Sequence, residues 1–112
     1  MTGTEPEGLL RVLIVYERPS VNKVTCHARC ISLERSIFPG DSVLPVDSSP
    51  GAGVSPARVL RMYRPPIGEF SELPAVWSAA MDLEAPEGAD LSWVQPDANL
   101  KVVPPTTGTE QG

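Results

Sequence analysis

The chain has 112 residues, of which 41% are hydrophobic and 21% are charged, a size and mix that predict one globular domain with a single core. Its formal charge of -5 is unlike that of most nucleic-acid-binding domains, which carry an excess of positive charge. No apolar run has the length of a membrane span or a signal peptide. We therefore expect a cytoplasmic or virion-associated protein that is neither secreted nor bound to a membrane.

The strongest secondary-structure signal lies at residues 9–33. Apolar and polar residues alternate strictly at positions 24–30, which predicts a strand with one buried face. Residues 10–16 are apolar on both faces and predict a central strand. Pro, Ser and Asn in the link at 18–22 predict an antiparallel hairpin, on which we expect the core to be assembled. A helix over residues 20–38 is the alternative, but the β-branched residues favour the strand.

Turn-forming residues interrupt the middle of the chain. Residues 39–41 read Pro-Gly-Asp and predict a turn, and Pro45 in the apolar run 42–46 predicts an edge strand. Residues 47–55 are rich in Ser, Gly and Pro and are expected to form a loop. This loop lacks the lysine and the third glycine of nucleotide-binding loops, so we expect no phosphate site there.

Two short helices are expected in the second half of the chain. Ser55 and Pro56 are the residue types of a helix N-cap and of a first helical position. They predict a helix over residues 57–64, which the two prolines at 65–66 end. Apolar residues at helical intervals predict a second helix over residues 72–83.

The last ordered stretch is predicted to be a second hairpin, with strands at residues 91–94 and 100–103. Residues 1–8 and 106–112 are poor in apolar residues and are expected to be disordered tails, which leaves a globular domain at 9–105. The predicted fold class is α+β: a small single domain with an antiparallel sheet built on two hairpins and with two short helices. An all-β sandwich or barrel is the alternative, in which both predicted helices would be strands.

Charge is divided unevenly along the chain. Between residues 9 and 64, eight basic residues stand against four acidic ones, whereas from residue 65 onward one lysine stands against eight acidic residues. One interpretation is that the protein has two binding faces. The other is that the two halves face each other across the fold and partly neutralise, a weak effect at exposed sites.

Cys26, His27 and Cys30 are the only cluster of metal-ligand residue types. A structural zinc site needs four ligands, and no second cysteine or histidine pair occurs elsewhere in the chain. In a strand, His27 would also point away from both thiols. We interpret the cluster as two small buried thiols and a half-exposed histidine, and we expect no metal and no cofactor. With one histidine available to any nucleophile, the sequence predicts no enzyme.

Three arginines give the strongest functional signal. In the predicted helix, Arg58, Arg61 and Arg64 would lie along one side with Tyr63 beside them, whereas a strand would divide the arginines between two faces. Guanidinium groups suit carboxylates as well as phosphates. Because the protein is acidic, we predict that these four residues bind a protein partner with an acidic surface, with nucleic acid as the weaker alternative.

The predicted function is a non-enzymatic protein–protein interaction or assembly module, such as a small structural or accessory subunit of a larger complex or viral particle. Binding of RNA through the arginine-rich helix face and a small regulatory inhibitor protein are the alternatives. No membrane partner is expected, and a homo-oligomer is compatible with this class. Trp77 and Trp93 are expected in the core, and either would be a candidate binding residue if it proved exposed.

Overall fold

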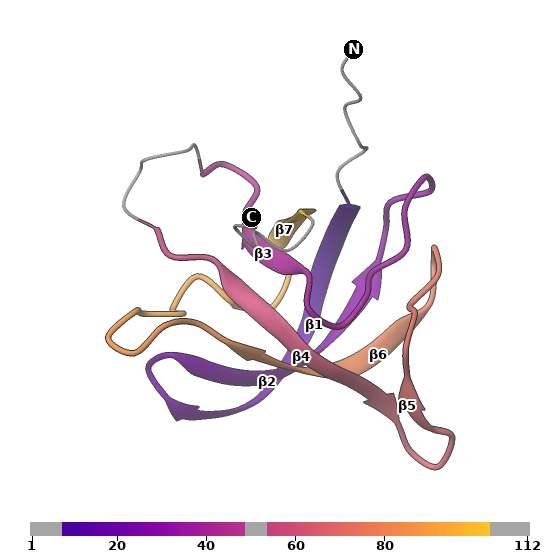
Figure 1. Ribbon diagram of the computed structural model, residues 1–112, viewed down its shortest axis with the longest axis horizontal. Coiled ribbons are helices and arrows are strands. Elements are labelled where there is room, and N and C mark those ends of the chain that lie inside the picture. The colour runs from indigo at the N-terminus through magenta and orange to yellow at the C-terminus, as the bar shows by residue number, and fades with distance from the viewer. Residues whose placement is uncertain (1–7, 49–53, 104–112) are drawn as a thin grey trace, which may run out of the picture.

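Seven strands form the part of the chain that the structure describes, residues 8–48 and 54–103 of a computed structural model (Figure 1). Within these residues there is no helix. The strands are β1 (Gly8–Ser20), β2 (Lys23–Cys30), β3 (Ser42–Pro45), β4 (Ala57–Arg64), β5 (Gly68–Phe70), β6 (Ser78–Glu84) and β7 (Asn99–Val103). The prediction of an α+β fold with two helices was therefore wrong, and the all-β barrel alternative is the correct class.

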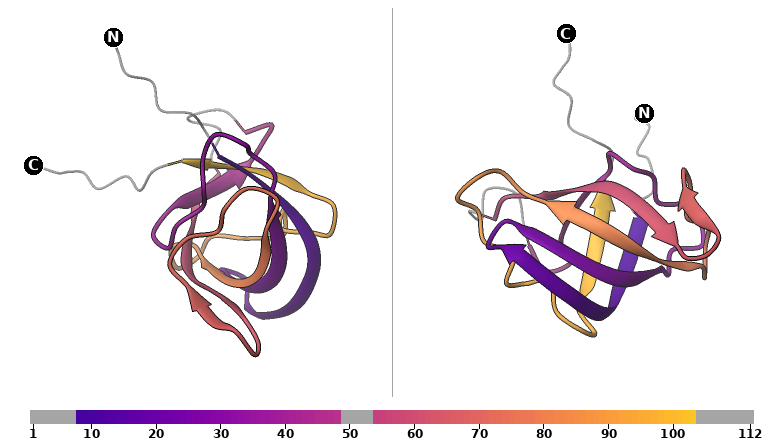
Figure 2. Two further views of the ribbon diagram at one scale, coloured as in Figure 1. Left: turned by 90° about the vertical axis from the view of Figure 1, so that its right-hand side faces the viewer. Right: turned by 90° about the horizontal axis from the view of Figure 1, so that it is seen from below.

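The sheet closes into an antiparallel barrel of six strands. Their order is β3-β7-β1-β2-β6-β4, and a further pairing of β3 with β4 joins the two ends. β3 pairs with the first two residues of β4, and β5 pairs with the last three residues of β4. Both strands therefore lie along the same edge of β4. Figure 2 shows the strands curving around a common interior, and its right-hand view looks onto the outer surface of β2, β6 and β4.

The predicted amino-terminal hairpin is present as β1 and β2, which pair in antiparallel fashion. The alternation seen in the sequence corresponds to burial, because Val24, Cys26, Ala28 and Cys30 all lie in the core. The second half of β1 contains register shifts relative to β2. Such irregularities increase the local bend of a strand, which barrel closure requires.

Neither predicted helix forms, because pairing with strand neighbours outweighs local helix signals. Residues 57–64 form β4, which has β6 on one side and β3 and β5 on the other. Within the second predicted helix, residues 72–83, the chain passes through a loop and then enters β6 at Ser78. The second predicted hairpin was also wrong, since residues 91–94 form no strand and β7 pairs with β1 and β3.

The predicted tails lie outside the described residues, apart from Gly8, which begins β1. Residues 49–53 of the predicted loop lie outside them as well. The edge strand predicted around Pro45 is β3, but barrel closure places it between β7 and β4. The pairing of β3 with β4 ends at Val43, so Pro45 pairs with β7 alone and has an edge position, where a missing backbone donor is tolerated.

The core fills the interior of the barrel. Each of the six barrel strands contributes buried apolar side chains, and loops add Ile37, Leu73, Leu91 and Val94. Trp93 is partly buried against this core, as predicted. Trp77 is not in the core, since 48% of its surface is exposed.

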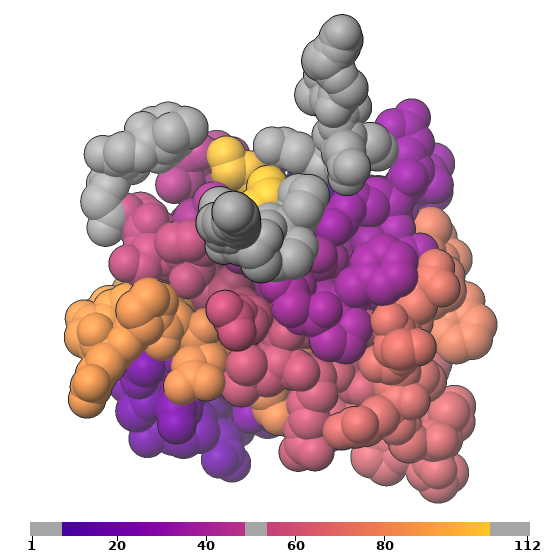
Figure 3. All heavy atoms as spheres, viewed as in Figure 1, coloured from indigo at the N-terminus to yellow at the C-terminus, as the bar shows by residue number. Residues whose placement is uncertain are grey.

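Two loops pack against each other at one side of the barrel. Ile37 pairs with Leu73 through two backbone hydrogen bonds of 3.0 and 2.8 Å. Figure 3 shows the segment after β2, in purple, next to the segment before β6, in salmon, on the right-hand side of the view. Close by in the chain, Arg35 Nη2 lies 2.9 Å from Asp41 Oδ1, and both side chains are largely buried. This ion pair fixes the turn that leads into β3.

Candidate functional site

The four predicted binding residues lie on β4 and not on a helix. This strand buries its side chains at positions 57, 59 and 62. A register shift between Val59 and Arg61 makes Leu60 the extra residue of a β-bulge. Because of this bulge, Arg58 before it and Arg61 and Tyr63 after it all lie on the outer surface of the barrel. Arg64, the last residue of the strand, is exposed at its end.

A network around Asp82 occupies the centre of this surface. Arg61 Nε donates a hydrogen bond of 2.8 Å to Asp82 Oδ2, and Arg61 Nη1 lies 3.4 Å from Glu69 Oε2. Thr25 donates to Asp82 Oδ1 at 2.9 Å, and the Tyr63 hydroxyl donates to the same oxygen at 3.4 Å. The guanidinium of Arg61 also lies 4.8 Å from the centre of the Tyr63 ring. Arg61 is thus paired with two of the protein's own carboxylates.

Ionisation within the network follows from these contacts. The hydrogen bond to Asp82, together with the charge of that carboxylate, raises the pKa of Arg61. Burial raises the pKa of the Tyr63 hydroxyl, and the neighbouring Asp82 charge raises it further. At neutral pH the network therefore holds a cationic guanidinium and a neutral phenol.

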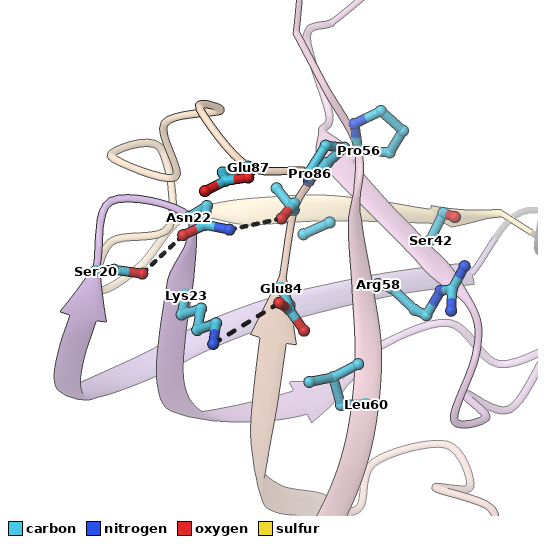
Figure 4. Close-up of a pocket in the computed structure, with 12 residues that line it drawn as sticks. Ser20, Asn22, Lys23, Ser42, Pro56, Arg58, Leu60, Glu84, Pro86 and Glu87 are labelled. Atoms are coloured by element: carbon cyan, nitrogen blue, oxygen red, sulfur yellow. Dashed lines mark hydrogen bonds and ion pairs between the residues drawn. The ribbon is translucent and has the colours of Figure 1, made fainter.

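Arg58 lies in a different setting, a surface pocket of about 750 Å³ that we call the Arg58 pocket. Cross-strand pairing lines up Lys23, Glu84, Arg58 and Ser42 across four neighbouring strands. Lys23 Nζ lies 3.9 Å from Glu84 Oε2. Figure 4 shows Lys23 turned toward Glu84, whereas the Arg58 side chain extends away from Glu84. Leu60, with 46% of its surface exposed, also lines this pocket.

Arg64 lines a second pocket of about 520 Å³, which we call the Ala80 pocket. Its other lining residues come from β1, β2, β4 and β6 and from the turn after β4: Tyr16, Thr25, His27, Tyr63, Pro65 and Ala80. His27 Nε2 lies 3.0 Å from Ser78 Oγ, and His27 Nδ1 lies 3.4 Å from the Tyr16 hydroxyl. Burial lowers the pKa of His27, and the charges of Arg64 and Arg29 lower it further. The histidine is thus neutral at neutral pH.

Ion pairs connect the basic first half of the sequence with the acidic second half. Four of them do so: Arg11–Asp97, Lys23–Glu84, Arg61–Glu69 and Arg61–Asp82. This arrangement agrees with the interpretation that the two halves face each other. Within residues 8–48 and 54–103, three exposed arginines make neither an ion pair nor a side-chain hydrogen bond: Arg29, Arg58 and Arg64.

Cys26 and Cys30 are buried, unlinked thiols, and His27 points to the opposite face of β2. Burial raises the pKa of Cys26 to about 12. In the described part of the chain no three His, Cys, Asp or Glu side chains are grouped as metal ligands. The same residues include no helix long and apolar enough to cross a membrane.

Sequence reasoning missed the partners that organise this surface. Ser78, Asp82 and Glu84 carry the polar outer face of β6, and Tyr16 stands on β1 beside His27. Polar residues at 78, 82 and 84 alternate with apolar ones, which is the signal of a half-buried strand. The helical interpretation of residues 72–83 hid this signal.

No protein-family model and no curated protein matches this chain. A solved structure does match it, a chain of GDP-bound aIF5B from Aeropyrum pernix. The two superpose with a TM-score of 0.63 at 17% sequence identity, over 88% of this chain. The match spans 15% of the aIF5B chain. At this level of identity the similarity concerns the fold, a barrel that forms a small part of a longer protein.

Proposed function

We propose that the barrel is a non-enzymatic protein-interaction module that binds an extended acidic segment of a protein partner along the outer surface of β4. The observation that carries this proposal is the state of Arg58 and Arg64. Both are exposed at opposite ends of β4, and neither is paired with a carboxylate in residues 8–48 or 54–103. A guanidinium binds a carboxylate through two parallel hydrogen bonds, which suits an acidic side chain.

The spacing of the two arginines defines the length of the partner segment. A strand rises about 3.3 Å per residue, so Arg58 and Arg64 are roughly 20 Å apart along β4. An extended segment of about six residues covers this distance. Both edges of β4 are already paired, by β6 on one side and by β3 and β5 on the other. The segment therefore binds through side chains and does not add to the sheet as a further strand.

The middle of the surface determines which residues the segment carries there. Arg61 is held between Asp82 and Glu69, so this region offers no spare positive charge. Leu60 and Tyr63 supply apolar surface beside it. An acidic residue of the partner would be repelled by Asp82 at this position. The preferred segment thus has acidic residues at both ends and apolar residues between them.

The similarity to part of a longer chain supports the module aspect of this proposal, since the matched barrel is a small share of aIF5B. The exposed arginines support the chemistry of the partner. Ion pairs on a protein surface contribute about 0.2–1 kcal/mol each and weaken with salt. We therefore expect modest affinity that falls as the salt concentration rises.

Fluorescence anisotropy with a labelled octapeptide tests the proposal. The peptide has two glutamates at each end and four apolar residues between them. Replacing both Arg58 and Arg64 with alanine removes two ion pairs and is expected to weaken binding by up to about 30-fold. The matched control replaces Arg11 and Lys101, which lie on β1 and β7 away from this surface, and removes the same charge.

Equal losses in the two double variants would contradict the proposal, because they would reflect net charge alone. Equal binding of a peptide with its four glutamates in the middle would contradict it as well. A labelled oligo-uridine tests the nucleic-acid alternative. Tighter binding of this RNA than of the peptide, with affinity falling steeply between 50 and 200 mM salt, would favour that alternative.

A further inference from the structure

We infer that the Ala80 pocket receives an aromatic side chain of the partner segment, next to the carboxylate that Arg64 binds. This inference rests on the proposed function, because it specifies one residue of the proposed segment. The pocket has a small residue, Ala80, surrounded by three rings. Ala80 is on the outer face of β6, and Tyr16, His27 and Tyr63 line the pocket with it.

The sheet fixes the width of this pocket. Ala80 pairs with His27 on β2 and with Tyr63 on β4, so the alanine lies between these two rings. Neighbouring strands are about 4.8 Å apart, which separates the backbones of His27 and Tyr63 by roughly 10 Å. Aromatic rings prefer centroid distances of about 4.5–7 Å. One further ring between His27 and Tyr63 therefore has a favourable distance to each. The volume of about 520 Å³ is also within the range of ligand pockets.

The walls of the pocket are held in place before any partner binds. His27 contacts Ser78 Oγ at 3.0 Å and the Tyr16 hydroxyl at 3.4 Å, and the two rings meet edge to face at a centroid distance of 6.3 Å. Tyr63 is anchored through Asp82 and lies against the Arg61 guanidinium. Rings that are already ordered lose little freedom on binding, which favours the bound state.

The charge around the pocket matches an aromatic residue that has an acidic neighbour. Arg64 lines the pocket, and Arg29 is close enough to influence His27. The lining residues include no carboxylate. A carboxylate next to the inserted ring would thus reach Arg64 without repulsion from the pocket itself.

Two pairs of labelled octapeptides test the inference. The two peptides of a pair differ at one position, next to the two terminal glutamates, where one has phenylalanine and the other has alanine. This position is near the amino end in one pair of peptides and near the carboxyl end in the other. We expect phenylalanine to tighten binding about 3- to 10-fold at one of the two ends. In Ala80→Leu the added side chain fills the pocket, so the phenylalanine and alanine peptides should bind with equal affinity. The affinity for the alanine peptide should be the same as that of the wild type. Ala80→Ser leaves the pocket open and should keep the preference.

If Ala80→Leu does not fold, as judged by circular dichroism, Tyr16→Ala replaces it, because Tyr16 is 55% exposed. This variant loses one wall and should lose at least half of the preference. If the wild type binds the phenylalanine and alanine peptides equally at both ends, the inference is overturned. The proposed function survives that result if the double variant Arg58→Ala with Arg64→Ala still binds both peptides more weakly than the wild type. Binding of oligo-uridine that Ala80→Leu abolishes would identify a nucleobase as the occupant and would overturn the inference too.

Discussion

Replacing Asp41 with alanine is expected to destabilise the barrel more than any single change on its outer surface. Asp41 is only 2% exposed. One of its carboxylate oxygens lies 2.9 Å from Arg35 Nη2, and the other accepts a hydrogen bond of 2.8 Å from the backbone N–H of Phe38. The backbone of Asp41 also accepts a hydrogen bond from Val59 of β4. The residue thus connects a buried ion pair to the strand that carries the candidate binding surface.

The size of the effect follows from burial. The Arg35 side chain is 12% exposed, and its Nη1 has no hydrogen-bond partner among the described residues. Removing Asp41 leaves this guanidinium as an uncompensated charge, which costs about 3–5 kcal/mol. The lost bond to Phe38 adds about 1 kcal/mol. The total of roughly 4–6 kcal/mol is a large part of the 5–15 kcal/mol by which a domain is stable.

Urea unfolding followed by the fluorescence of Trp77 and Trp93 measures this loss. With a slope of about 2 kcal/mol per molar urea, we expect the midpoint to fall by roughly 2–3 M. Lys23→Ala, which breaks the exposed pair with Glu84, is the control and should cost less than about 1 kcal/mol. Replacing Arg35 with methionine in Asp41→Ala should restore stability, because no buried charge remains. The reasoning is refuted if Asp41→Ala costs no more than Lys23→Ala.

Two further predictions concern groups whose ionisation depends on the fold. Folding lowers the pKa of His27 below its ordinary value of 6.5. As the pH falls through 6.5, the unfolded chain therefore binds a proton more readily than the folded protein does. The contribution of His27 to stability should be complete above pH 6.5 and should decline below it, and the decline should be smaller in His27→Asn. Identical pH profiles of thermal unfolding for the two proteins would contradict this prediction. Burial raises the pKa of Cys26 to about 12, so a chromogenic disulfide reagent at pH 8 should leave Cys26 unmodified in the native protein and should modify it in urea. Rapid reaction of native Cys26, measured by mass spectrometry, would count against the buried position.

The parts of the fold that the sequence predicts are those determined by neighbouring residues. The hairpin of β1 and β2 follows from local alternation and from a short link rich in turn formers. The strands β4 and β6 do not, since residues 57–64 combine helix-start signals with a pattern that fits both elements. Their state is decided by pairing with each other and with β2, β3 and β5. Apart from the short hairpin of β4 and β5, these contacts join segments that are far apart in the sequence, and no local pattern records them.

The predicted binding residues lie on the outer surface of β4 although the element predicted for them, a helix, was wrong. In a regular strand, residues three apart point to opposite faces, so Arg58 and Arg61 would be divided. The extra residue at Leu60 returns them to one surface, an outcome that the helix prediction reached for a different reason. The helix prediction could not say which arginine is available to a partner, because the carboxylate that holds Arg61 comes from Asp82 on β6. Whether an arginine on β4 is free to bind a partner depends on the residues of the neighbouring strand β6. Under the proposed function, the two ends of β4, at Arg58 and Arg64, are therefore the positions where a partner's carboxylates would bind.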